Sequence, residues 1–208
     1  MAVINRMAEL HDEITAWRRK YHSNPELMYD VHETAGDVAE KLKSFGCDEV
    51  VTGIGRTGVV AVIKGNKPGI GVVGLRADMD ALPITEITEL PYASKNNGKM
   101  HACGHDGHTA MLLGAARYLA ETRNFAGTAV MIFQPAEEGG AGGKAMVDDK
   151  LMERFGIQEV YGMHNLPGLA VGEFAICDGP IMASTDEFTI TLKGRGAHAA
   201  MPHLGIDP

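Results

Sequence analysis

The chain has 208 residues, of which 45% are hydrophobic and 22% charged, the composition of a soluble globular protein. Its 27 acidic and 19 basic residues give a formal net charge of −8, which argues against binding to nucleic acid or to an anionic membrane surface. No apolar run approaches the ~18 residues that a membrane-spanning helix needs. Three scattered cysteines and an N-terminus without the apolar core of a signal peptide favour a cytoplasmic location.

The first half of the chain predicts two helices and then two strands. Apolar residues recur with helical spacing over residues 3–22 and again over 33–45. Two runs rich in valine and isoleucine follow, at 57–64 and 70–77, each bounded by glycine or proline. The second run is apolar on both faces, which indicates a buried central strand.

Helices and strands then alternate along the chain. The sequence predicts a helix at 109–122, a strand at 128–133, a helix at 144–155 and a strand at 160–163. This alternation is typical of an α/β fold with a mostly parallel sheet that is covered by helices on both faces.

The pattern changes near residue 180. Residues 187–193 alternate apolar and polar side chains, which predicts a half-exposed strand. We therefore place a domain boundary at about residue 182, with a first domain over 1–182 and the start of a second over 183–208. Because so few residues cannot enclose a core of their own, we expect the sequence to be part of a longer protein.

The stretch from Met100 to Thr109 holds the densest group of candidate metal ligands. Cys103, His105 and His108 lie within six residues, directly before the helix predicted at 109–122. Taken alone, this pattern is most simply a helix N-terminus with chance histidines. His108 is expected to support the ligands without binding the metal itself. Four further histidines are interpreted as surface or locally hydrogen-bonded groups: His11, His22, His32 and His101.

Polar side chains follow three of the predicted strands. Asp78 and Asp80 come after the strand at 70–77, Glu137 and Glu138 follow the next strand, and His164 ends the last. Each alone has a simpler explanation, as a turn cap, a solvated loop or a strand-end histidine. Together they fall on one edge of one sheet, outside the carboxyl ends of the strands, where α/β proteins place their sites.

This set has a natural chemical assignment. The four candidate metal ligands are Cys103, His105, Glu138 and His164. Glu137 is a spare carboxylate beside a ligand carboxylate, the arrangement needed to take a proton from metal-activated water. Asp80 is expected to orient a histidine ligand. The assignment predicts metal-dependent hydrolysis of an amide bond.

Several segments also carry a family resemblance. They are Arg19–Leu27, Leu75–Pro83, Met100–Thr109, Phe133–Gly139 and Gly162–His164. In this order they resemble the hippurate hydrolase and indole-3-acetyl-amino-acid hydrolase branch of the aminoacylase/carboxypeptidase metallopeptidase superfamily. The resemblance covers essentially the whole chain.

The resemblance implies a zinc-peptidase-like domain with two divalent metal ions, which could be Mn, Zn, Co or Ni. It implies the same four ligands, with Glu137 as general base, and a small N-acyl or N-aroyl amino acid as substrate. The wider superfamily has a metal-binding histidine at the position of Asp78, and the branch uses Cys103 instead. The branch's last metal-binding histidine would lie beyond residue 208.

The segment Gly194–His203 resembles the start of an inserted α+β lid and dimerisation domain. In relatives its first histidine, here His198, reaches the substrate in a neighbouring subunit, so the resemblance implies a homodimer. Two alternatives stay open at this point. One is deacetylation of an N-acetyl-diamino acid, and the other is a non-catalytic metal-binding module, if the downstream ligand is missing.

Overall fold

The computed structural model describes residues 4–184, 186 and 188–208 and divides the chain into two compact units, Met1–Pro167 and Gly168–Pro208. The elements of the first unit are α1 (Asn5–Glu9), α2 (His11–Ser23), α3 (His32–Ser44), β1 (Glu49–Ile54), β2 (Gly58–Lys64), β3 (Lys67–Asp78), α4 (His105–Thr122), β4 (Ala126–Gln134), α5 (Gly142–Asp148), α6 (Leu151–Phe155) and β5 (Glu159–Gly162). The second unit contains a 3-10 helix, η1 (Pro202–Leu204). Among the helices of the described residues, none is both long and apolar enough to span a bilayer.

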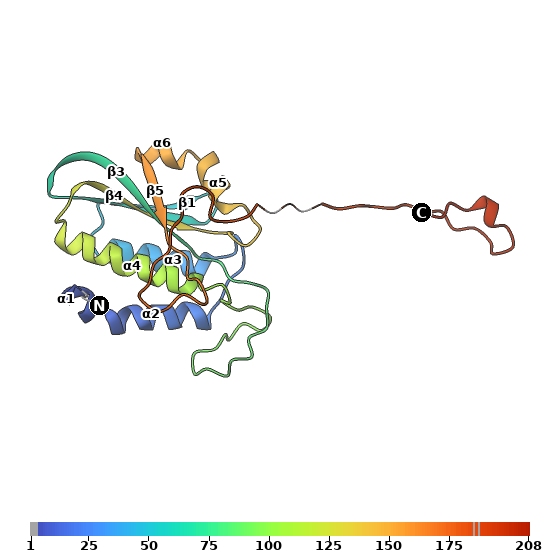
Figure 1. The fold of residues 1–208 in the computed structure, drawn as a ribbon, viewed down its shortest axis with the longest axis horizontal. Helices are drawn as coiled ribbons and strands as arrows, with labels where there is room; N and C mark the ends of the chain where they lie inside the picture. The colour runs from blue at the N-terminus through green and yellow to red at the C-terminus, as the bar shows by residue number, and fades with distance from the viewer. Residues whose placement is uncertain (1–3, 185, 187) are drawn as a thin grey trace. The chain divides into compact units, whose positions relative to one another are not determined.

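The first unit is built on a five-stranded sheet in the order β1-β2-β4-β3-β5. β2 is antiparallel to both of its neighbours, β1 and β4, whereas β3 is parallel to β4 and to β5. Four of the five strands therefore point in one direction, which confirms the predicted mostly parallel sheet. Helices α3 and α4 cover one face of the sheet and α5 and α6 the other (Figure 1).

The larger core lies between the sheet and helices α3 and α4. It includes Phe133 of β4, Val38 and Leu42 of α3, and Leu113 of α4, none of which is exposed to solvent. The helical spacing of these apolar residues gives each helix a face that the sheet can cover. A smaller core on the opposite face joins Met146 of α5 and neighbours from α6 to the sheet.

Helix α2 forms an outer layer on α4, and the contact depends on a small residue. A Cβ atom at Gly114 of α4 would lie 2.6 Å from Cδ1 of Ile14 in α2. Glycine at this position lets the two helices approach closely, so that Trp17 and Tyr21 of α2 reach the larger core.

Three local features differ from the sequence prediction. The predicted helix over 3–22 is two helices, which meet at Leu10. The predicted helix over 144–155 is also divided, because Lys150 adopts a left-handed backbone with φ of 65° between α5 and α6. Strand β1 was not predicted, since Thr52 and Gly53 interrupt its apolar pattern.

The second unit lacks the strand predicted for residues 187–193, at least over 188–193; Glu187 lies outside the described residues. A strand is stable only when it pairs with others, and these six residues have no strand partner within the described chain. The boundary predicted at about residue 182 falls inside this unit and stays a prediction.

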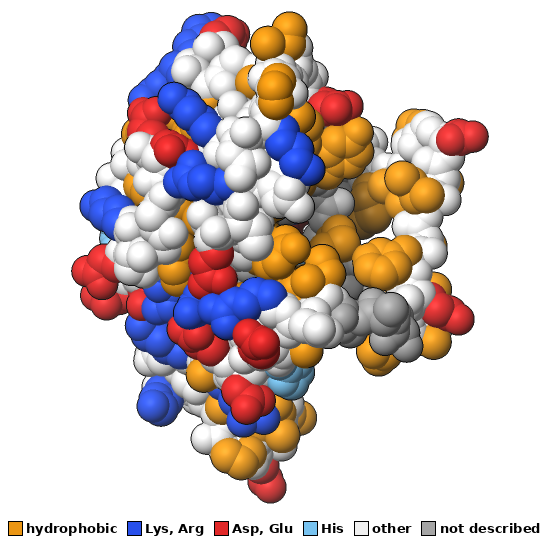
Figure 2. Space-filling view, turned by 90° about the vertical axis from the view of Figure 1, so that its left-hand side faces the viewer, with side chains coloured by type: hydrophobic (Ala, Val, Ile, Leu, Met, Phe, Trp, Pro, Cys, Tyr) orange, Lys and Arg blue, Asp and Glu red, His pale blue; other side chains and the backbone are white. Residues whose placement is uncertain are grey.

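Acidic and basic side chains are mixed on the surface of the first unit. On the face in Figure 2, lysines and arginines alternate with aspartates and glutamates. The ion pairs of α1, α2 and α4 follow the same pattern: Arg6 pairs with Glu121, and Arg117 pairs with Glu13 and Glu121. Exposed pairs of this kind contribute little to the free energy of unfolding, so the two cores dominate the stability of the fold.

The larger core predicts that alanine substitutions at two positions of α4 lower the free energy of unfolding by different amounts. Leu113→Ala removes a fully buried side chain and should lower the free energy of unfolding by about 2–5 kcal/mol. Met111→Ala is the matched control, because Met111 is 44% exposed on the same helix and its change should stay within about 0.5 kcal/mol. Urea denaturation followed by circular dichroism measures both. Equal effects at the two positions would contradict the assigned core.

Candidate metal centre

The strand register brings the carboxyl ends of three strands to one edge of the sheet. Asp78 of β3 lies opposite Gln134 of β4, and Arg76 of β3 lies opposite Gly162 of β5. The residues that follow these strands therefore meet at the same edge. Helix α4 begins there with His105, earlier than predicted.

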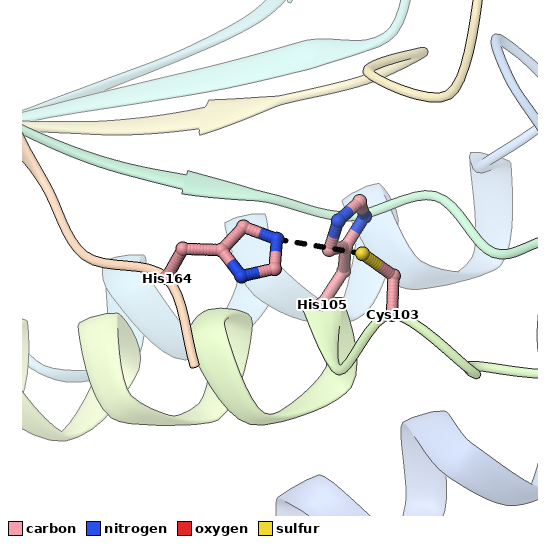
Figure 3. A group of neighbouring side chains, drawn as sticks. All are labelled: Cys103, His105 and His164. Atoms are coloured by element: carbon pink, nitrogen blue, oxygen red, sulfur yellow. Dashed lines mark hydrogen bonds between the residues drawn. The ribbon is translucent and has the colours of Figure 1, made fainter. Parts of the chain in front are cut away.

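Three of the predicted ligands form one group at this edge (Figure 3). Cys103 comes from the loop before α4, His105 is the first residue of α4, and His164 follows β5. Each offers one ligand atom, and the three atoms lie within 4.8 Å of one another. The Cys103 Sγ and His164 Nε2 atoms are 3.4 Å apart.

His105 is the residue that joins this group to the glutamates. Its Nδ1 atom lies 2.8 Å from the backbone carbonyl oxygen of Asp80 and donates a hydrogen bond to it. That bond directs Nε2 toward the site, 3.8 Å from Oε1 of Glu138 and 3.9 Å from Oε2 of Glu137. The two glutamates and His105 form a second group of candidate ligands.

Asp80 connects the two groups. Its carboxylate accepts hydrogen bonds from the backbone N–H of Glu137 at 3.0 Å and of Glu138 at 3.1 Å. The same carboxylate lies 3.5 Å from Nδ1 of His105. Asp80 thus holds the glutamate loop as well as the histidine, whereas the sequence suggested only the histidine contact.

Asp78 lies behind His105 and is fully buried. It accepts a hydrogen bond from Nδ1 of His108 at 2.7 Å and pairs with Arg76 at 2.7 Å. Burial alone would raise the pKa of Asp78, but the bond from His108 and the positive charge of Arg76 outweigh it and lower that pKa to about 2. Asp78 is therefore a carboxylate at neutral pH, 3.5 Å from Nε2 of His105.

These residues fit a divalent cation. Nε2 of His105 and Oε1 of Glu138 are both buried without a hydrogen-bond partner, which is costly unless another group binds them. Burial, together with the carboxylates of Glu138, Glu137 and Asp78, raises the pKa of Cys103 to about 12. A cation would satisfy the orphaned atoms and offset this concentration of negative charge.

His198 belongs to the second unit. Its side chain is exposed, and its Nδ1 atom accepts a hydrogen bond from the backbone N–H of Ala200 at 3.2 Å. Its predicted contact with substrate stays a prediction.

Two histidines are more buried than the sequence interpretation allowed. His22 is 3% exposed, and its two ring nitrogens lie 2.8 Å from Asp106 and 3.2 Å from Glu86. His101 is 4% exposed. Because Asp106 directly follows His105, His22 ties the end of α2 to the first turn of α4. The sequence pattern does not reveal this contact, because Asp106 and Glu86 are distant from His22 in sequence.

The sequence pattern of peptidase family M20/M25/M40 matches residues 74–206. The chain belongs to this family. It is 49% identical over 209 aligned positions to the hippurate hydrolase of Campylobacter jejuni, covering 100% of this chain and 54% of that protein. It is 46% identical over 203 positions to the N-acetyl-L-cysteine deacetylase of Bacillus subtilis, covering 97% of this chain and 48% of that protein. The chain thus spans about half the length of these relatives.

A solved structure confirms the fold. The Bacillus subtilis YXEP protein, described as a dinuclear metal-binding peptidase from the M20 family, superposes with a TM-score of 0.74 at 42% identity. The match covers 79% of this chain and 46% of that one. The metallopeptidase fold implied by the sequence resemblance is therefore correct for the first unit.

The raised pKa of Cys103 predicts that metal affinity depends on pH. Below a pKa of about 12 the thiol carries a proton, and a metal that binds the thiolate must displace it. The apparent affinity should therefore rise with pH, about tenfold per unit for this one proton. Zn²⁺ titrations between pH 7.5 and 9 measure the slope. Cys103→Ala should bind more weakly with a slope smaller by one proton, and an unchanged slope would remove Cys103 from the ligands.

Proposed function

We propose that the full protein is a metal-dependent amidohydrolase that cleaves the amide bond of N-acyl or N-aroyl amino acids. The observation that carries this proposal is the position of Glu137. Its carboxylate lies 3.9 Å from Nε2 of His105, and its side chain is 41% exposed. The carboxylate of Glu138 lies 3.8 Å from the same atom, but its side chain is only 19% exposed. One carboxylate can therefore serve as a ligand while its neighbour stays accessible to a substrate.

The residues take the following roles in this proposal. The metal would be held by Cys103, His105, Glu138 and His164. Divalent ions bound there would supply positive charge that polarises the amide carbonyl and lowers the pKa of the attacking water. Glu137 accepts a proton from that water and passes it to the nitrogen of the leaving amine. Asp80 holds His105 in position through its backbone carbonyl and Glu137 through its carboxylate.

We infer two divalent ions for the complete centre. The YXEP relative is described as dinuclear, and the donors of this chain form groups that share His105. Thiolate, imidazole and carboxylate ligands together suit Mn, Zn, Co or Ni. The metal that supports activity is identified by adding each ion to the metal-free protein and measuring the rate of amide hydrolysis.

The substrate class rests on the relatives. Hippurate hydrolase is the relative with 49% identity, which favours an N-aroyl or N-acyl amino acid. The N-acetyl-L-cysteine deacetylase favours a short acyl group as the second candidate. A panel of N-benzoylglycine, N-acetylcysteine and an N-acetyl-diamino acid separates these possibilities. A full chain that binds metal but cleaves none of them would support the non-catalytic module instead.

We further infer a cytoplasmic homodimer in which residues after about 182 begin a lid and dimerisation domain. The support for this location is the small number and scattered placement of the cysteines in the sequence, Cys47, Cys103 and Cys177. His198 would then meet the substrate bound to the neighbouring subunit.

The role of Glu137 predicts the result of an isosteric substitution. Glu137→Gln keeps the shape of the side chain but removes the proton acceptor, so the rate of hydrolysis should fall by about 10² or more while metal content is unchanged. Glu153→Gln, in α6, is the control and should keep the normal rate. Metal analysis beside an assay with N-benzoylglycine tests this. A near-normal rate for Glu137→Gln would exclude Glu137 from the proton transfer.

The proposed role of His198 predicts complementation between subunits. His198→Ala and Glu137→Gln should each be inactive as a pure dimer. If His198 acts on its neighbour, a mixed dimer has one site with both defects and one with none. An equal mixture that exchanges subunits should recover about a quarter of the wild-type rate, since half the dimers are mixed. No recovery, with exchange confirmed by mass spectrometry, would show that His198 acts within its own subunit, and a fully active His198→Ala dimer would show that it has no role at the site.

A further inference from the structure

Asn165, the residue after His164, is not a candidate metal ligand, but it contacts several residues of the site. Its backbone nitrogen lies 3.2 Å from Nε2 of His108, and its side-chain oxygen Oδ1, which can only accept a hydrogen bond, lies 2.6 Å from the same atom. Asn165 follows β5, whereas His108 is in the first turn of α4. This residue therefore ties the end of β5 to α4, the helix that begins with His105.

Gly104 provides the space for the Asn165 side chain. It has a φ of 95°, and a Cβ atom built on it would lie 2.3 Å from Oδ1 of Asn165. Only glycine leaves room for the amide at this point. Because Gly104 stands between Cys103 and His105, the amide of Asn165 packs directly against the backbone that carries two candidate ligands.

His108 gives Asn165 a rigid partner. Its ring is 4% exposed, and Nδ1 donates to the fully buried Asp78 at 2.7 Å. The ring also packs edge-on against that of His164, with 4.6 Å between ring centroids. Asp78, His108 and Asn165 thus form a continuous chain from the end of β3 to the residue beside His164.

The backbone of Asn165 also controls the ring of His164. Its carbonyl oxygen lies 2.8 Å from Nδ1 of His164 and accepts a hydrogen bond from it. This bond leaves the lone pair of Nε2 directed toward Cys103 Sγ, 3.4 Å away (Figure 3). A histidine ligand is fixed in tautomer and orientation by such a bond on its other nitrogen.

We propose that Asn165 is a positioning residue of the metal centre, and that its amide, held by His108 over Gly104, orients His164 toward Cys103. This inference rests on the proposed metal-binding function. Without the amide, the segment after β5 keeps its carbonyl but loses the contact that fixes where the carbonyl lies. The His164 ring then binds metal from a wider range of orientations.

Cobalt spectroscopy of the full chain tests this, because bound Co²⁺ reports the geometry of its ligands independently of activity. Asn165→Ala should weaken Co²⁺ binding about 10- to 100-fold and shift the visible ligand-field bands. The melting temperature of the metal-free variant should lie within a few degrees of that of the wild type, because Asn165 is exposed. Asn124→Ala, at an exposed asparagine, is the matched control and should change none of these.

His108→Phe is the second variant, since it keeps a ring in the core but removes the hydrogen bond to Asp78 and the contacts of Nε2 with Asn165. It should shift the cobalt bands in the same direction as Asn165→Ala, and the double variant should show little more than either alone. Cobalt bands and affinity like those of Asn124→Ala in either single variant would overturn the role of Asn165. A wild-type chain that binds no Co²⁺ would instead overturn the metal-binding function, and the inference with it.

Discussion

The candidate site depends on the hydrogen bonds of Asp80. Its backbone carbonyl holds His105, and its carboxylate accepts two backbone N–H groups from Glu137 and Glu138. A fully buried carboxylate is tolerated only when its oxygens are satisfied, and these bonds satisfy them. One residue at the end of β3 thereby fixes the helix on one side and the glutamate loop on the other.

The site also concentrates negative charge where the protein offers little to balance it. Arg76 pairs with Asp78, whereas within the described part of the chain Glu137 and Glu138 lie within ion-pair distance of His105 alone. The fold supplies the energy to hold these carboxylates together, through the two apolar cores on either side of the sheet. Binding of a cation would relieve the repulsion, so metal affinity and stability of the folded state are coupled.

Residues at the strand ends could be predicted from the sequence because apolar runs locate buried strands, and such strands place their carboxyl ends at one edge. Cys103, His105 and His164 meet at this edge. The burial of His22 could not be predicted, since Asp106 and Glu86 are distant in sequence. The break at Lys150 was missed because a left-handed lysine has no signature of its own.

The candidate ligands are far apart in the sequence, since they extend from the loop before α4 to the residue after β5. On the ribosome, Cys103 and His105 therefore emerge well before His164. A nascent chain that has not yet completed β5 presents a thiol and an imidazole without the third donor of their group. Metal acquired at that stage would be held by an incomplete set of donors, so correct metal loading requires that β5 has been synthesised.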